Sequence, residues 1–326
     1  MNSSRSIRKK GGNLGQVRQA VLSYAEFHAG FQIRAKLSTV GQLMSDLPPD
    51  FSHSPIRRFV RYGYRLPMLI WHLFVHLPVV LFLISPIGAS MRTASGERLD
   101  HRAIRWWQGN LMRVFGFRPR RIGEPRGGTT FFVANHCSWL DITLLHSQRA
   151  VSFVAKAEIA RWPVVGWLAS RAGTIYHQRG SNSSFARVAE LMVVRLQEGA
   201  DVGVFPEGGT GAVDHVRTFH ARIFQTCYDA DVPAQPVALR YARGAEPARE
   251  VAFRDNESFF ANFWRLLGNP GCEAEVHFLP IIAPNPEGRR KMSDQARRQI
   301  IAALAFATPD AAGEAASDEL DPLLEK

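Results

Sequence analysis

The sequence predicts an α/β domain whose central sheet is mostly parallel or mixed and is covered by helices. From about residue 120 to residue 307, short apolar runs alternate with segments of helical periodicity, the order expected of strands joined by helices. The apolar runs show little alternation between apolar and polar positions, as expected when helices cover both faces of a sheet. Hydrophobic residues make up 46% of the 326 residues, so a substantial core is available.

The elements of this domain follow one another in a regular order after a turn-like entry at residues 123–128. Strands are expected at residues 129–134, 151–155, 174–177, 202–205, 235–240 and 275–279. Helices are expected at residues 140–148, 158–170, 184–198, 219–230, 258–267 and 294–306. Because strands and helices alternate throughout, the pattern indicates a single domain over residues 119–307.

An apolar segment, residues 66–91, precedes this domain and has no formal charge if its histidines are neutral. It is long enough to cross a bilayer as a helix, but Pro78 would kink or split that helix. Arginines flank the segment at both ends. Because positive charge marks the cytoplasmic side of a membrane, the arginines would place both ends of the segment on that side. A bent or interfacial insertion resolves this conflict; a buried core helix is the alternative. We therefore predict that residues 61–118 form membrane-associating helices.

The end of this membrane-associating region, residues 99–117, has apolar residues at helical spacing. Trp106 and Trp107 stand beside arginines, and the membrane interface accommodates both aromatic rings and cations. An ordinary amphipathic helix packed on the domain is the alternative. The expected location is a membrane with the α/β domain on its cytoplasmic face, which is the inner membrane if the source is bacterial.

The composition limits the partners of the chain. A net charge of +11 indicates an anionic partner, such as a nucleic acid, an anionic lipid or a phosphorylated substrate. The three cysteines are far apart and form no metal-binding or disulfide pattern, so a reducing compartment and no metal site are expected. Residues 1–60 form a basic extension without a secretory signal, and residues 308–326 form an acidic tail that we expect to be mobile.

One candidate site begins directly after the apolar run that ends at Ala134. His136 and Asp141 stand five residues apart in the loop where an open α/β sheet binds ligands. In a tight turn, Asp141 can reach one imidazole nitrogen and leave the other free to accept a hydroxyl proton. On spacing alone, a capped helix start explains the pair equally well.

A glycine-rich loop follows a second apolar run. Gly208, Gly209 and Gly211 allow a close backbone approach to a ligand, and Glu207 could bind substrate hydroxyls or stabilise the loop. An ordinary strand-ending turn is the alternative, and no Walker lysine follows.

Two cations follow other predicted strands. Lys156 and Arg179 stand where they could hold a phosphate, although a solvated surface charge is the usual interpretation of an isolated Lys or Arg. Four strands would thus deliver His and Asp, Lys, Arg and a glycine-rich Glu loop to one edge of the sheet.

Four sequence blocks occur in a fixed order and resemble those of a known family. They are NHCSWLD, GTIYHQRG, VFPEGGTGA and VPAQPVALR. In this order they resemble the glycerolipid acyltransferases typified by 1-acylglycerol-3-phosphate acyltransferase, and the likeness covers residues 100–285. His-x4-Asp together with Phe-Pro-Glu-Gly at this separation is specific, whereas each block alone is not.

This resemblance implies an enzyme that moves a fatty acyl group from acyl-CoA or acyl carrier protein to a lipid hydroxyl, with no cofactor. The acceptor expected first is 1-acylglycerol-3-phosphate, which would give phosphatidic acid. By the motif, His136 would be the general base and Asp141 its orienting acid. The residues implied to bind substrate are Asn135, Lys156, Arg179, Phe205, Pro206, Glu207, Gly208, Gly209 and Pro236. Among these, Arg179 and Lys156 would hold a phosphate, and Pro236 would lie near the acyl chain.

The chain departs from the family pattern after Glu207. The family often has Phe-Pro-Glu-Gly-Thr-Arg-Ser, whereas Gly209-Thr210-Gly211 stands here without the arginine. The run Phe219-His220-Ala221-Arg222 stands where a Phe-Lys-Lys-Gly-like run is common. Positive charges near the acceptor loop are therefore fewer. This favours, as an alternative, the branch that acylates lysophospholipids or lyso-ornithine lipids.

Other classes of function agree less well with the sequence. A serine hydrolase would need a Gly-x-Ser-x-Gly elbow, which does not occur. Cys137 is an alternative nucleophile, but its neighbour His136 is poorly placed to serve it as a base. A nucleic-acid-binding module would explain the charge, yet no such motif is present, so no nucleic acid partner is expected. A non-catalytic membrane scaffold stays open at this stage.

Overall fold

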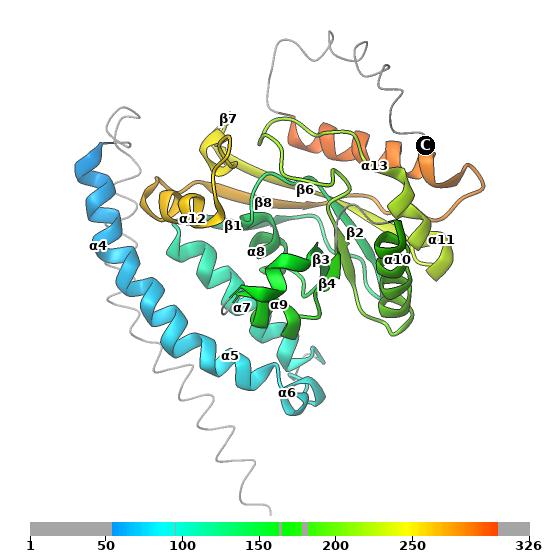
Figure 1. Cartoon of the computed structure of the whole chain (residues 1–326), viewed down its shortest axis with the longest axis horizontal. Helices are drawn as coiled ribbons and strands as arrows, with labels where there is room; N and C mark the ends of the chain where they lie inside the picture. Colours follow the sequence, from blue (N-terminus) through cyan, green and yellow to red (C-terminus); the bar gives the residue numbers. More distant parts are fainter. Residues whose placement is uncertain (1–53, 95, 163–164, 178–181, 306–326) are drawn as a thin grey trace, which may run out of the picture. The chain divides into compact units, whose positions relative to one another are not determined.

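The computed structural model describes residues 54–94, 96–162, 165–177 and 182–305. These residues contain an eight-stranded sheet with the order β1-β8-β6-β2-β5-β3-β4, and β7 pairs with β6 (Figure 1). The strands are β1 (Arg118–Ile122), β2 (Phe131–Ala134), β3 (Ser152–Lys156), β4 (Ile175–His177), β5 (Val202–Val204), β6 (Ala234–Arg243), β7 (Glu246–Pro247) and β8 (Glu273–Phe278). Strands β2 to β6 are mutually parallel, whereas β8 runs antiparallel to β6. The prediction of a mixed sheet covered by helices is confirmed.

Strand β2 lies inside the parallel part of the sheet and is buried along its whole length. Phe132 and Ala134 belong to the core cluster that includes residues of α7 (Leu99–Val114) and α8 (Leu140–His146). Phe131 and Val133 belong to a second cluster on the opposite face. Both faces of β2 are therefore covered, which explains why its sequence shows no alternation.

The remaining helices of the α/β domain connect or cover these strands. They are η2 (Ala157–Arg161), α9 (Val165–Arg171), α10 (Asn182–Gln197), η3 (Ala221–Phe224), α11 (Gln225–Ala230), η4 (Arg249–Val251), α12 (Phe259–Gly268) and α13 (Gly288–Leu304). The single helix expected at 158–170 is instead two. Trp162 has an extended backbone, the conformation that Pro163 favours in the residue before it.

Two strands of the sheet were not anticipated from the sequence. Strand β1, with the sequence RPRRI, is mostly exposed at the sheet edge and lacks an apolar pattern. Strand β7 has only two residues. The helix expected at 219–230 also differs, because a 3₁₀ turn, η3, precedes α11.

A long helical stretch precedes the sheet. It consists of α4 (Pro55–Trp71), a π-helical turn (His72–His76), α5 (Leu77–Leu83) and α6 (Pro86–Ser90). Residues 55–83 of this stretch are long and apolar enough to cross a membrane. The expected disturbance at Pro78 takes the form of the preceding π-helical turn, which suits a position where proline removes a helical hydrogen bond.

The polar and apolar side chains of this stretch are arranged in an unusual way. The side turned toward the rest of the protein carries the buried polar side chains Arg61, Arg65 and His72. The opposite side carries exposed apolar side chains, including Phe59 at 79% and Phe74 at 76%. Leu69, Leu77 and Val80 are also buried on the inner side, so that side is mixed in character. An outer face of large exposed apolar side chains, with arginines buried on the inner side, is typical of helices that contact lipid.

Helix α7 packs into the core of the α/β domain. Its Met112 is fully buried beside Phe115 and Phe117, which follow the helix. Trp107 is buried and stacks on His72 at 5.0 Å, whereas Trp106 is 39% exposed. Helix α7 thus packs on the domain, as one of the two interpretations of residues 99–117 expects, and contact of its exposed side with a membrane stays a prediction. The expected basic extension falls outside the described residues up to residue 53, and the acidic tail falls outside them entirely.

Candidate active site

The His136–Asp141 pair forms at the carboxyl edge of the parallel strands. Strand β2 ends at Ala134, and α8 begins at Leu140, so the residues between them make a short turn. Within this turn His136 Nδ1 lies 2.7 Å from Asp141 Oδ2. The contact inferred from spacing alone is therefore present in the structure.

Asp141 is fully buried and is surrounded by hydrogen-bond donors. Its Oδ2 also accepts the backbone N–H groups of Cys137 at 2.7 Å and Ser138 at 2.8 Å. Its Oδ1 accepts the hydroxyl of Tyr241 at 2.8 Å. Because these donors replace water around the buried carboxylate, Asp141 is held as an acceptor for Nδ1–H of His136. That tautomer leaves Nε2 of His136 with a lone pair.

Tyr241 is a further member of this site, and no sequence motif points to it. It lies 100 residues beyond Asp141, inside the apolar run of β6, and its side chain is fully buried. Burial, together with the Asp141 carboxylate, raises the pKa of the Tyr241 hydroxyl well above its usual value. Tyr241 therefore stays protonated and donates to Asp141.

Cys137, the alternative nucleophile, is buried beside Asp141. Burial above all, and then the Asp141 carboxylate, raises the pKa of its thiol well above the usual value. Its Sγ donates to Asp141 Oδ1 at 3.6 Å. A nucleophilic cysteine needs a thiolate, so this environment argues against that role.

Glu207 connects the glycine-rich loop with the histidine turn. Its Oε1 accepts the backbone N–H of His136 at 2.8 Å, and its Oε2 accepts that of Arg217 at 3.0 Å. The Gly211 N–H donates to the His136 carbonyl at 2.7 Å. Burial raises the pKa of Glu207, although both amides oppose that shift. Of its two expected roles, loop stabilisation is the one visible in the contacts.

Phe205 lies against the His136–Asp141 pair. Its ring stacks on the His136 imidazole with centroids 4.0 Å apart and planes 11° apart. On its other side it stacks on Phe153 of β3 at 5.4 Å. The imidazole plane is thus fixed by a ring stack as well as by Asp141.

The backbone of the glycine-rich loop lies close to the side chains of His220 and Arg217. Gly208 has φ +70°, a conformation that other residues adopt only with strain, and a Cβ there would lie 3.0 Å from His220 Nε2. A Cβ at Gly209 would lie 3.4 Å from Nη1 of Arg217. The exposed Arg217 side chain therefore lies along the loop, although it is 10 residues from Glu207 in sequence.

The other residues selected from the sequence have different surroundings. Lys156 is exposed at the end of β3, and Arg179 falls outside the described residues. Asn135 is buried, and its side chain makes paired hydrogen bonds with the Leu239 backbone at 2.8 and 3.0 Å. Pro236 is buried in β6 opposite Val133. The Pro206 carbonyl accepts the His220 N–H. Roles for these residues in substrate binding stay predictions.

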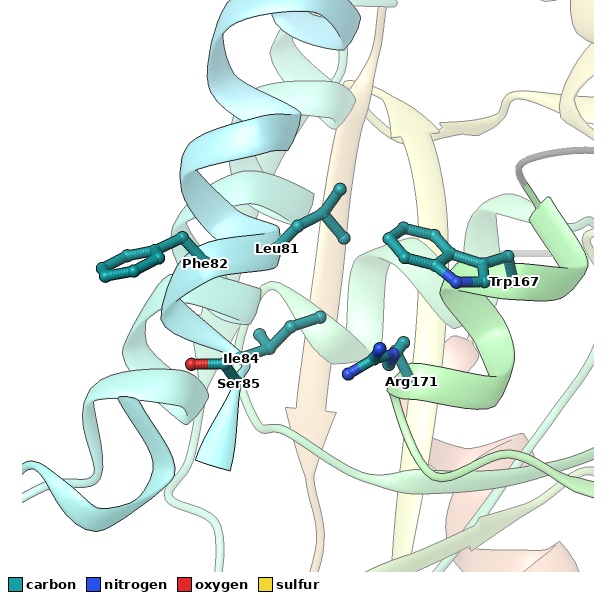
Figure 2. Close-up of a pocket in the computed structure, with 6 residues that line it drawn as sticks. All are labelled: Leu81, Phe82, Ile84, Ser85, Trp167 and Arg171. Carbon is teal, nitrogen blue, oxygen red and sulfur yellow. The ribbon is translucent and has the colours of Figure 1, made fainter. Parts of the chain in front are cut away.

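A groove lies between the end of α5 and helix α9. Figure 2 shows Leu81 and Ile84 on the side of α5 that faces Trp167 and Arg171, with Phe82 pointing away. The Arg171 guanidinium lies over the Trp167 ring at 5.6 Å. This groove contains none of the residues selected for the catalytic site. Among the described residues, no group of three or more His, Cys, Asp or Glu side chains could hold a metal ion.

Comparison with known proteins identifies related sequences and a related fold. Residues 103–240 match the family model described as Acyltransferase. A lyso-ornithine lipid O-acyltransferase of Pseudomonas aeruginosa is 34% identical over 206 residues, which are 63% of this chain and 80% of that protein. A 1-acyl-sn-glycerol-3-phosphate acyltransferase of Neisseria meningitidis is 33% identical over 225 residues, 67% of this chain and 88% of that protein.

The crystal structure of PlsC, the 1-acyl-sn-glycerophosphate acyltransferase of Thermotoga maritima, has the same fold. Its TM-score is 0.57 at 19% identity, over 78% of this chain and 98% of that one. The family match covers β2 and most of β6; it includes His136 and Asp141 and ends one residue before Tyr241. The chain is an enzyme and belongs to the acyltransferase family that includes these glycerolipid and ornithine-lipid enzymes.

Proposed function

We propose that this enzyme moves a fatty acyl group from acyl-CoA or acyl carrier protein to the hydroxyl of a lysolipid at a membrane. The observation that carries the proposal is the 2.7 Å contact between His136 Nδ1 and the buried Asp141. This contact leaves Nε2 of His136 free to act as a base. The residue stands at the carboxyl edge of the sheet, where ligands of such folds bind.

In the proposed reaction, Nε2 of His136 takes the proton of the acceptor hydroxyl as its oxygen attacks the thioester carbonyl. The new C–O bond gives a tetrahedral intermediate, which collapses by breaking the C–S bond. The thiolate leaves with the proton from His136, so the base is regenerated. Asp141 stabilises the imidazolium between the two proton transfers. The stack on Phe205 holds the orientation of the His136 imidazole during both proton transfers.

Two acceptors suit this site, and different observations support them. For 1-acylglycerol-3-phosphate, the exposed Arg217 along the glycine loop offers a guanidinium for the phosphate. For a lyso-ornithine lipid, the missing arginine after Glu207 and the relative from Pseudomonas aeruginosa are the supporting observations. We propose 1-acylglycerol-3-phosphate as the acceptor and a lyso-ornithine lipid or other lysophospholipid as the alternative.

The direct test is a lipid-product assay with the purified full chain. Each lysolipid is offered with acyl-CoA and, separately, with acyl carrier protein, and the products are identified by mass. Formation of phosphatidic acid supports the first acceptor, and ornithine lipid supports the second. If no combination gives an acylated lipid while the protein is folded, the proposed activity is wrong.

Arg217→Gln separates the two acceptors. If a phosphate binds the Arg217 guanidinium, the variant raises the Michaelis constant for 1-acylglycerol-3-phosphate by about tenfold, the effect of losing one charge-assisted contact. The constant for a lyso-ornithine lipid changes little, because that acceptor carries no phosphate. Arg289→Gln, an exposed position on α13, is the matched control. Equal constants in Arg217→Gln and wild type would remove Arg217 from the acceptor site.

Tyr241→Phe tests the surroundings of Asp141. The variant removes one donor to a buried carboxylate, so we expect the free energy of unfolding to fall by about 1.5–3 kcal/mol and kcat to fall by about tenfold. Urea unfolding and initial rates measure the two effects. In Tyr228→Phe, which loses a hydroxyl that donates to the Asn285 carbonyl at 3.1 Å, stability falls but kcat is retained. A kcat loss of the same size in both variants would show that the effect is only structural.

We also propose that α4 and α5 attach the enzyme to the membrane, with the catalytic domain on the cytoplasmic face. The support is the apolar outer face of this stretch and its length. The arginines at both ends favour a bent or interfacial insertion over a straight span.

A further inference from the structure

Helix α12 has one buried face and one exposed aromatic face. Asn262 and Arg265 are buried, whereas Phe260 is 68% exposed and Trp264, one turn later, is 50% exposed. Two large rings at this spacing form an apolar stripe on the surface of the α/β domain. The proposed reaction at His136 uses neither ring.

This stripe continues the apolar outer face of α4. Tyr62 stacks on Trp264 with centroids 5.6 Å apart, and its hydroxyl donates to the Trp264 carbonyl at 2.9 Å. Arg65 donates to the carbonyls of Leu267 and Asn269 at 2.9 and 2.7 Å. Figure 1 shows α4 and α12 side by side. Because these bonds fix α12 to α4, whatever covers the outer face of α4 also lies beside Phe260 and Trp264.

The buried face of α12 contacts the catalytic turn. Trp139 follows His136 by three residues, and its Nε1 donates to Asn262 Oδ1 at 3.0 Å. Its ring also stacks on Phe263 at 5.5 Å. Asn262 in turn donates to Glu257 at 2.9 Å. A shift of α12 would therefore move the residues between β2 and Asp141.

The chemistry of the stripe identifies its occupant. Trp and Phe rings beside arginines are typical of the interfacial layer of a bilayer. Arg58 lies over the Tyr62 ring at 5.8 Å, so a cation stands beside the stripe as it would beside anionic headgroups. The adjoining surface of α4 and α5 is the one already assigned to lipid.

We propose that the Phe260–Trp264 stripe of α12 inserts into the same lipid leaflet as α4 and α5. It is the membrane contact of the α/β domain itself, and through Trp139 and Asn262 it holds the catalytic turn at the lipid surface. This inference rests on the proposed function, because it concerns how a lysolipid embedded in a membrane reaches His136.

Labelled cysteine variants of the full chain test the contact. Cys137, Cys227 and Cys272 are all buried, so one introduced surface cysteine can carry a fluorophore selectively. Phe260→Cys, Phe74→Cys and Leu191→Cys are reconstituted in phosphatidylcholine–phosphatidylglycerol vesicles that contain lipid with a nitroxide on its acyl chain. Leu191 is 43% exposed on α10, and Figure 1 shows helix α10 at the other side of the sheet from α12. We expect the nitroxide to quench the label in the first two variants and to leave the third unchanged.

The three positions distinguish the ways in which the proposal can fail. Quenching in Phe74→Cys but not in Phe260→Cys would overturn the α12 contact and leave the membrane attachment of α5 standing. The absence of quenching in both would overturn the membrane attachment as well. A dimer of the wild-type chain in detergent that Phe260→Ala dissolves, without quenching in Phe260→Cys, would assign the stripe to a second copy of the chain.

A kinetic measurement tests the consequence for the reaction. Phe260→Ala with Trp264→Ala should raise the Michaelis constant for lysolipid in vesicles by about tenfold more than for lysolipid in detergent micelles, because insertion of both rings is lost. Leu191→Ala with Val194→Ala removes comparably exposed apolar side chains from α10 and should change neither value. Equal losses on vesicles and micelles would overturn the proposed role, since they would report a folding defect.

Discussion

His136→Ala is expected to lower kcat by at least about a thousandfold, because in the proposed mechanism this residue takes the proton of the acceptor hydroxyl. The substitution should leave the fold intact. Two of the contacts that hold this residue in the turn use its backbone, namely the N–H bonded to Glu207 and the carbonyl bonded to Gly211. Alanine keeps both. Transfer of a radiolabelled acyl group to lysolipid, at saturating donor and acceptor, measures the loss.

Two further variants complete this test. His215→Ala removes an exposed histidine that follows the glycine-rich loop and should retain full activity. Asp141→Asn keeps the shape of the side chain but can present an amide donor to His136 Nδ1, so it should lower kcat by about a hundredfold or more. If His136→Ala retained activity close to wild type, general-base catalysis by this residue would be excluded, whatever the family relationship.

The sequence predicted the buried part of the fold well and its exposed part poorly. Strand β2 could be predicted because both of its faces are covered, so its four residues are all apolar. Strand β1 could not, because its exposed edge position leaves its sequence polar. The prediction of a single helix over residues 158–170 is wrong, because the range contains Pro163 and proline favours an extended backbone in the residue before it.

The same distinction holds for the candidate site. His136 and Asp141 stand in one turn, so their contact follows from local geometry. Tyr241 and Arg217 reach the site only through the pairing of β6 with β2 and the return of a long loop, which spacing does not show. Asn135 stands in the motif itself, yet its side chain contacts the backbone of β6. The motif thus indicates which residues lie near the site, but the contacts of each side chain depend on the tertiary structure.

Glu207→Gln is expected to lower kcat by about ten- to a hundredfold with little change in the Michaelis constant for lysolipid. The wild-type carboxylate accepts one N–H from the histidine turn and one from Arg217. A glutamine has only one oxygen for these two donors. Its NH2 group would therefore face the N–H of the second donor. The turn or the loop therefore moves, and Nε2 of His136 leaves its productive position. Steady-state kinetics with lysolipid as the varied substrate separates the two constants.

The division between kcat and the Michaelis constant decides what Glu207 does. If its carboxylate bound the hydroxyls of the acceptor directly, the Michaelis constant would rise and kcat would change less. Glu198→Gln, an exposed position whose carboxylate pairs with Arg195, is the matched control and should change neither constant. Because a buried donor left without its acceptor costs about 1–3 kcal/mol, Glu207→Gln should also unfold at lower urea concentration. Unchanged kinetics in a destabilised Glu207→Gln would show that the two loops need not be joined for catalysis.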